Sequence, residues 1–257
     1  MQTATLEVGS TTVRGVSLDG VTRVLGAKRV LERVDLQVPD RGRLGIVGRS
    51  GSGKSTLLSL VAGLAEPDAG SIAVGGETSA AGRLAHCALM PQRDCLLPWR
   101  SALDNACLAL ENRGSPRSDA RRRAAPLFDR LGLTGSEHLR PSRLSGGMRQ
   151  RVAFLRTLLA GKDVLLLDEP FGALDAITRA ELQVWLDGVL ASEPRTMLLV
   201  THDVEEALLL CNSVAVLSAG RITAVFDIEI ARDRPRREVV TDPAFVELRE
   251  RALEALE

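Results

Sequence analysis

The strongest constraint on the fold of this chain is a glycine-rich stretch at residues 48–56. Its residues are Gly48, Arg49, Ser50, Gly51, Ser52, Gly53, Lys54, Ser55 and Thr56. The stretch fits the phosphate-loop pattern, in which two glycines separated by four residues are followed by lysine and by serine or threonine. The apolar residues 44–47 before it predict a short buried strand, and residues 56–61 predict a helix. A loop between a strand and a helix is the context that this pattern requires.

The chemistry of the loop favours a nucleoside triphosphate. Glycines let the backbone approach phosphate groups, and the amides at the start of the next helix point toward them. Lys54 adds a positive charge, and the Ser55 hydroxyl is suited to bind Mg²⁺. A turn that only caps a helix is the simpler alternative, but the flanking strand and helix argue against it.

The composition excludes several other classes of protein. Hydrophobic residues make up 45% of the 257 residues, which indicates a globular protein of one domain with a subdomain, or of two small domains. The 33 basic residues balance the 33 acidic ones, so charge does not point to nucleic acid or an anionic membrane. No apolar run approaches the roughly twenty residues that span a bilayer, and the amino terminus lacks a signal-peptide pattern. We therefore expect a cytoplasmic protein whose link to a membrane is a partner.

Further strands and a helical insert surround the loop. Strand patterns occur at residues 12–18, 34–38, 71–74 and 86–90. Helical patterns follow at residues 101–112, 118–131 and 145–160. The alternation in the first two strands predicts half-exposed antiparallel pairing. The basic run from Arg121 to Arg123 has two interpretations, nucleic-acid binding or a solvated helix face, and a neutral chain favours the second.

The third helix of the insert begins with a second candidate phosphate site. Ser145 is a good N-cap, and Gly146 and Gly147 leave the first-turn amides open to an anion. The apolar stripe behind them consists of Met148, Val152, Leu155 and Leu159. Two such helix ends in one chain are unlikely to reach a single phosphate, unless they meet across a subunit interface.

Two acidic residues end a strongly apolar strand. Residues 164–167 predict a central parallel strand buried on both faces, and Asp168 and Glu169 follow it. At this position Asp168 can hold Mg²⁺ through water, and Glu169 can polarise the water that attacks a γ-phosphate. A purely structural role as loop caps is the alternative, but burying adjacent carboxylates without a cation is costly.

A histidine follows the next buried strand, predicted at residues 196–200. Asp203 and Glu206 have the spacing of an acidic variant of the capping box, which places His202 at a strand-to-helix turn. Such turns form the edge of the sheet at which α/β proteins bind ligands. A lone histidine is more often structural, but this position favours a functional role.

These motifs, in this order, resemble those of the ATP-binding cassette (ABC) ATPases. The resemblance rests on residues 48–56, on Gln92 after a strand, on residues 144–150, on residues 164–175 and on His202. It covers nearly the whole chain. It implies an α/β fold with a P-loop NTPase core, an antiparallel β subdomain and a helical subdomain.

The same resemblance implies one domain over residues 1–257. Residues 1–92 and 161–230 would form the core with the β subdomain, residues 93–160 the helical subdomain and residues 231–257 a helical tail. It also implies a head-to-tail dimer with two ATP molecules between the phosphate loop of one subunit and the signature of the other. The signature residues here are Ser145, Gly146, Gly147, Met148 and Gln150.

The resemblance further implies individual roles. Glu169, His202 and Gln92 would be catalytic, with His202 contacting the γ-phosphate. Ser55, Gln92 and Asp168 would be the Mg²⁺ ligands. Asp175 would lie at the dimer interface.

Finer features resemble the importer ATPases for nitrate, sulfonate and taurine. They are the motif at residues 96–100, Asp104 with Asn105, the segment 170–175 and the segment 242–249. This implies a membrane permease partner, an indirect solute-binding protein, a peripheral position on the inner membrane face and no nucleic-acid partner. Trp99 would contact the permease or pack the junction between the core and the insert. The alternatives are a soluble ABC ATPase acting on nucleic acid or another assembly, and a nucleotide-dependent regulator.

Two residues depart from the family pattern. Leu25 stands where these ATPases usually place an aromatic residue that stacks on adenine, and no aromatic residue precedes the phosphate loop. We therefore expect Leu25 to be the base contact. Arg43 stands where a glutamate is common, and the sequence offers no physical reason for it.

The missing aromatic residue predicts weak base selectivity. Stacking of a base on an aromatic ring is worth roughly 1–3 kcal/mol, and Leu25 offers only apolar contact. We expect the dissociation constants of ATP and GTP to lie within about tenfold of each other, a difference below roughly 1.4 kcal/mol. Leu25→Tyr should tighten the binding of both nucleotides. Calorimetric titration with Mg²⁺ checks this, and a strong wild-type preference for ATP would contradict it.

Overall fold

The computed structural model describes residues 15–230, 234 and 236–256. The strands are β1 (Val16–Leu25), β2 (Lys28–Val38), β3 (Arg43–Val47), β4 (Ala69–Val74), β5 (Cys87–Met90), β6 (Val164–Asp168), β7 (Thr196–Thr201), β8 (Ser213–Ser218) and β9 (Arg221–Asp227). The helices are α1 (Lys54–Val61), α2 (Ala80–His86), α3 (Ala102–Asn112), α4 (Arg117–Arg130), α5 (Gly146–Leu159), α6 (Ala176–Ser192), α7 (Val204–Leu210), α8 (Arg236–Val239) and α9 (Pro243–Glu254), with a 3-10 turn η1 (Pro141–Arg143).

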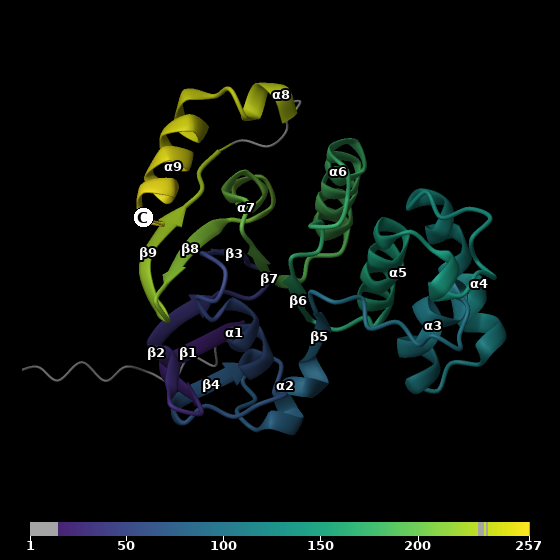
Figure 1. The fold of residues 1–257 in the computed structure, drawn as a ribbon, viewed down its shortest axis with the longest axis horizontal. Coiled ribbons are helices and arrows are strands. Elements are labelled where there is room, and N and C mark those ends of the chain that lie inside the picture. Colours follow the sequence, from purple (N-terminus) through teal and green to yellow (C-terminus); the bar gives the residue numbers. More distant parts are fainter. Residues whose placement is uncertain (1–14, 231–233, 235, 257) are drawn as a thin grey trace, which may run out of the picture.

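A mixed sheet in the order β5-β6-β7-β3-β8-β9 forms the centre of the described chain. Its first five strands are parallel, and β9 pairs antiparallel with β8. A second, antiparallel sheet has the order β2-β1-β4, and α3 to α5 form a separate helical unit beyond β5 (Figure 1). The expected α/β core with an antiparallel sheet and a helical addition is confirmed. None of the helices in the described part of the chain is long and apolar enough to cross a bilayer.

The central strand β6 is buried along its whole length because both of its faces are covered. Leu165 and Leu167 point into a core shared with α3 to α6. Val164 and Leu166 point into a second core, which is shared with α1 and the antiparallel sheet. The uninterrupted apolar run therefore contributes to two cores. The first polar residue, Asp168, stands at the carboxyl end of the strand.

Two helices of the fold were not predicted. Helix α2 has seven residues, too few to show a period, and is capped by Ser79. Helix α6 is capped by Asp175 and buries Leu182, Leu186 and Leu190, so its four-residue spacing was readable in the sequence. The antiparallel strands are also longer than expected, and residues 12–14 of the first predicted strand lie outside the described residues.

Several charged residues have structural partners that the sequence did not reveal. Arg117 and Arg121 of α4 both bind the buried carboxylate of Asp104 in α3. The basic run is thus only partly a solvated face, because Arg121 stabilises a buried charge. Arg43, which stands where a glutamate is common, forms an ion pair with Asp187 of α6.

The close packing of α7 on β3 depends on a glycine. A Cβ atom added to Gly45 would lie 2.7 Å from the Cβ of Ala207. We expect Gly45→Ala to lower the free energy of unfolding by about 1–3 kcal/mol, because the helix and strand must separate. Gly188→Ala is the matched control, since nothing lies within 4 Å of its added Cβ in α6. This change should raise stability by about 0.5–1 kcal/mol. Chemical denaturation measures both, and equal effects would contradict the packing argument.

Candidate functional site

The phosphate loop joins β3 to α1 and is held in shape by its own lysine. Lys54 Nζ donates hydrogen bonds to the carbonyl oxygens of Gly48, at 2.7 Å, and Arg49, at 2.9 Å. Gly53 has a φ of 107°, which favours glycine, and an added Cβ would lie 2.8 Å from Leu31 Cδ2. Burial lowers the pKa of Lys54, while the charges of Glu169 and Asp168 act to raise it. The loop is therefore a closed turn with a buried ammonium group at its centre.

Asp168 ends β6 and faces this loop. Its side chain is buried, and burial raises the pKa of Asp168, whereas a hydrogen bond from the Ser55 hydroxyl acts to lower it. The described residues contain no cluster of three or more His, Cys, Asp or Glu that could hold a metal ion. The oxygen pair of Asp168 and Ser55 nevertheless suits Mg²⁺, which takes one or two protein ligands and completes its shell with phosphate and water. The buried Ser52 hydroxyl has no hydrogen-bond partner among the described residues.

Glu169 is held in an unusual backbone conformation at the end of the strand. Its φ of 49° is rare for a residue with a side chain and costs roughly 1–3 kcal/mol. Two hydrogen bonds of 2.8 Å maintain it, one from its amide to the Val200 carbonyl and one from Gln150 Nε2 to its own carbonyl. Its carboxylate accepts a hydrogen bond from Gln92 Nε2 at 3.2 Å and lies 3.5 Å from His202 Nδ1. The structure thus brings the three predicted catalytic side chains together.

His202 lies in the turn between β7 and α7 and is 64% exposed. Asp203 caps α7 by accepting a hydrogen bond from the Glu206 amide at 3.2 Å, as expected. The reciprocal bond of a capping box, from the Asp203 amide to the Glu206 carboxylate, is absent from the described residues, so this part of the prediction is wrong. Glu206 is buried and accepts a hydrogen bond from the Thr201 hydroxyl at 3.1 Å, and this hydroxyl also accepts one from the Asp203 amide.

The signature segment starts α5. Ser145 caps the helix by accepting a hydrogen bond from the Met148 amide at 3.2 Å, and Gly146 is exposed, as an anion site requires. Gln150 is buried and also acts within its own chain, because its side chain joins the Glu169 carbonyl to the Ala173 amide. No hydrogen bond or ion pair of the described residues joins residues 145–147 to residues 48–56.

Two other predicted site residues lie at the ends of elements. Asp175 caps α6 and accepts hydrogen bonds from the amides of Ile177 and Thr178, and the Thr178 bonds in particular lower the pKa of Asp175. Leu25 ends β1 at the tip of the hairpin and is 49% exposed. The hairpin approaches Gly53 through Val30 and Leu31. The base contact of Leu25 stays a prediction.

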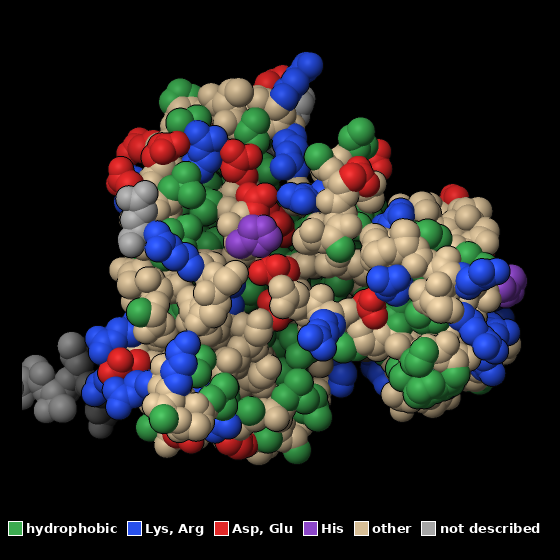
Figure 2. Space-filling view, viewed as in Figure 1, with side chains coloured by type: hydrophobic (Ala, Val, Ile, Leu, Met, Phe, Trp, Pro, Cys, Tyr) green, Lys and Arg blue, Asp and Glu red, His purple; other side chains and the backbone are tan. Residues whose placement is uncertain are grey.

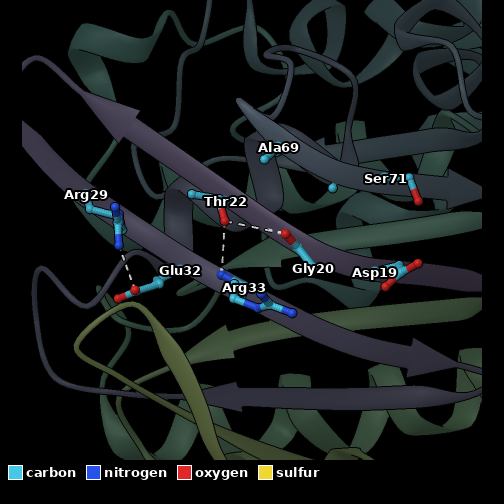
Figure 3. Close-up of a pocket in the computed structure, with 9 residues that line it drawn as sticks. Asp19, Gly20, Thr22, Arg29, Glu32, Arg33, Ala69 and Ser71 are labelled. Carbon is cyan, nitrogen blue, oxygen red and sulfur yellow. Dashed lines mark hydrogen bonds and ion pairs between the residues drawn. The ribbon is translucent and has the colours of Figure 1, made fainter.

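One face of the molecule carries acidic side chains and a histidine at the strand ends (Figure 2). Figure 2 shows acidic side chains and a histidine gathered over the region where Figure 1 places the ends of β6 and β7. A separate hollow of about 540 Å³ lies on the antiparallel sheet, with Arg29, Glu32 and Arg33 around it (Figure 3). It shares no residue with the phosphate loop, and Glu32 is already paired with Arg29 and Arg221.

Comparison with known proteins identifies the arrangement. Residues 31–172, more than half of the chain, match the family described as ABC transporter. The chain is 47% identical to the aliphatic sulfonates import ATP-binding protein SsuB 1 of Rhodococcus jostii over 227 residues, which are 88% of each chain. It is 42% identical to the formylaminopyrimidine import ATP-binding protein ThiZ of Halalkalibacterium halodurans over 83% of each chain.

Solved structures show the same fold. The chain resembles the dimeric ATP-binding cassette MJ0796 in a post-hydrolysis state bound to ADP and Pi, with a TM-score of 0.76 and 27% sequence identity. The match covers 83% of this chain and 99% of the other. A second dimeric structure of the same cassette gives a TM-score of 0.78.

The buried Glu206 predicts a pH-dependent stability. Burial raises the pKa of Glu206 from its ordinary value of 4.5 to about 7. Between these values the folded protein holds a proton that the unfolded chain releases, so stability should fall as pH rises through the window, by about 3 kcal/mol in all. Glu206→Gln should remove this slope. Urea denaturation between pH 5 and 8 measures it, with Glu205→Gln as control, since Glu205 is half-buried and paired with Arg249 at the surface. Parallel wild-type and Glu206→Gln profiles would contradict the prediction.

Proposed function

The chain belongs to the ABC transporter family, and from this premise we propose that it drives the import of a small solute through a membrane permease. It is an ATP-binding cassette ATPase. The observation that carries the proposed mechanism is the position of the Glu169 carboxylate, which lies between Gln92 and His202 at the end of the strand that buries Asp168. Each of these groups has one chemical task.

Nucleotide binding depends on the phosphate loop. ATP approaching the loop offers phosphate oxygens to Lys54, whose ammonium group is bonded to two loop carbonyls and can exchange them for the stronger anionic partners. Asp168 and Ser55, with Gln92, would hold Mg²⁺, which when bound neutralises charge on the β- and γ-phosphates. A bound cation would also offset the cost of burying Asp168.

Hydrolysis requires a base beside the γ-phosphate. We assign Glu169 to orient the attacking water and accept its proton, because its carboxylate is the group that Gln92 and His202 both approach. His202 would donate a hydrogen bond to the γ-phosphate, for which its exposed ring is free. The backbone bonds of Glu169 keep the base from drifting, which preserves the alignment on which such catalysis depends.

A second copy of the chain would complete the site. The Ser145 helix end presents open amides but is not bonded to the phosphate loop of its own chain, which supports a role toward the partner's nucleotide. The solved MJ0796 cassettes are described as dimeric, and one holds ADP and Pi. We therefore propose a head-to-tail dimer with the signature acting in trans and Asp175 at the interface.

The permease would dock near Trp99. This side chain is 69% exposed, so it does not pack the junction between the core and the helical unit. Its loop is rigid, because the buried Asn105 side chain accepts a hydrogen bond from the Leu97 amide and donates to the carbonyls of Leu97, Arg100 and Ser101. A large aromatic residue on a pre-ordered loop is the usual form of an interface anchor.

The solute belongs to the class of small polar molecules. Two relatives with similar sequence identity to this chain are named for different solutes, aliphatic sulfonates and formylaminopyrimidine. Sequence identity with this chain therefore does not by itself select the solute. We propose a sulfonate-like or related solute, delivered by a solute-binding protein, with the chain held at the cytoplasmic face of the membrane by its permease. The permease and the binding protein would contact the solute, and this chain would not.

Removal of the proposed base should separate binding from turnover. We expect Glu169→Gln to bind ATP and Mg²⁺ within about twofold of wild type, yet to lower kcat by at least ~10²-fold, the lower end for general-base catalysis. The stalled protein should elute as a dimer with ATP on size-exclusion chromatography. Phosphate release measures turnover. Near wild-type hydrolysis would show that Glu169 is not the base.

If Trp99 anchors the permease, its removal should weaken permease binding and leave the ATPase activity of the isolated protein unchanged. Trp99→Ala should leave the ATPase rate of the isolated protein within about twofold but weaken binding to the permease by at least tenfold, or about 1.4 kcal/mol. Val225→Ala is the control, because Val225 is 54% exposed on β9 at the opposite edge of the sheet. Pull-down with the permease checks this, and equal binding by both variants would contradict the assignment.

A further inference from the structure

Arg179 of α6 joins two functional segments that the sequence keeps apart. Its Nη2 donates a hydrogen bond to the Leu174 carbonyl at 3.2 Å, next to the proposed interface residue Asp175. Its Nη1 lies 3.7 Å from Asp203 Oδ2, in the turn that carries His202. One guanidinium group therefore spans from the interface segment to the proposed γ-phosphate contact.

The turn that carries His202 is held in place by the side chains of the residues on either side of the histidine. Thr201 and Asp203 flank His202 on either side, and each is bonded to Glu206 of α7, the first through its hydroxyl and the second through the Glu206 amide. His202 itself is largely exposed, and its Nδ1 lies 3.5 Å from the Glu169 carboxylate. The direction of its ring thus depends on flanking residues held by hydrogen bonds, and Arg179 reaches this turn from α6 as Glu169 does from the end of β6.

Two polar atoms, one of Arg179 and one of Glu206, make no hydrogen bond within the part of the chain that the structure describes. Arg179 Nε and Glu206 Oε1 are both buried without a hydrogen-bond partner among the described residues. Their charges act on each other, since Arg179 lowers the pKa that burial raises in Glu206. Buried polar groups are nearly always bonded, so these two atoms leave hydrogen-bonding capacity unused beside the turn that carries His202.

We propose that Arg179 is a positioning residue, which transmits the placement of the Leu174–Asp175 segment to His202 through Asp203. The inference rests on the proposed function, because it assigns Arg179 to the turnover step that His202 serves. When the interface segment is seated, Arg179 holds Asp203 and so keeps the histidine over the γ-phosphate. Without Arg179 the nucleotide still binds, since the phosphate loop is untouched, but the histidine is aligned only part of the time.

The test is a set of variants of the full chain, assayed for ATP affinity and turnover. Arg179→Ala should lower kcat about tenfold and leave the dissociation constant of ATP within twofold. Arg179→Lys should recover part of the rate, because an ammonium group can still pair with Asp203. Asp203→Asn keeps the helix cap but removes the charge, so it should lower kcat to a similar extent. The double variant should be no slower than the slower single variant, because both changes remove one link.

The matched control is Arg195→Ala. Arg195 is similarly half-buried and bonds a backbone carbonyl, that of Leu158, and a carboxylate, that of Glu193, but it precedes β7 at the opposite end from His202. A tenfold loss of kcat in Arg195→Ala, a multiplicative loss in the double variant or an unchanged kcat in Arg179→Ala would each overturn the proposal. A wild-type protein without ATPase activity would instead overturn the proposed function, so the two failures are distinguishable.

Discussion

The burial of a carboxylate beside a lysine organises this structure. Asp168 is 5% exposed at the end of a strand that is covered on both faces, and Lys54 is 6% exposed in the loop that faces it. Neither charge would be stable there alone, because burying an unpaired ion in a protein costs on the order of several kcal/mol. The sheet order that sets β6 two strands from β3, with β7 between them, brings the two charges and the base Glu169 to one edge.

Much of the fold and site could be predicted, because the responsible signals are local. The phosphate loop carries glycines at fixed spacings, at residues 48, 51 and 53, and the apolar run before Asp168 shows a strand covered on both faces. Ser145 and Asp203 could be recognised as caps, since a cap acts within three residues. The grouping of Gln92, Glu169 and His202 came from the family resemblance, and the structure shows them in contact.

What could not be predicted depends on contacts between distant segments. Arg43 looked unexplained because its partner Asp187 lies 144 residues further on. Gln150 looked like part of the signature alone, since nothing local shows that its amide bonds Glu169 and Ala173. Glu206 fitted a capping box by spacing, but a buried threonine hydroxyl competes for its carboxylate. Helix α6 is the exception, because the spacing of Leu182, Leu186 and Leu190 is a local signal for a buried helix face.

The division of β6 between two cores has a consequence for cooperativity. Alternate side chains of this strand belong to the helical side and to the antiparallel side, so neither side can open without exposing part of the shared wall. The two halves should melt as one unit, with β6 among the last amides to exchange with solvent. The base Glu169 therefore follows directly on the strand that we expect to open last, so the carboxylate keeps its position while less buried parts of the fold fluctuate.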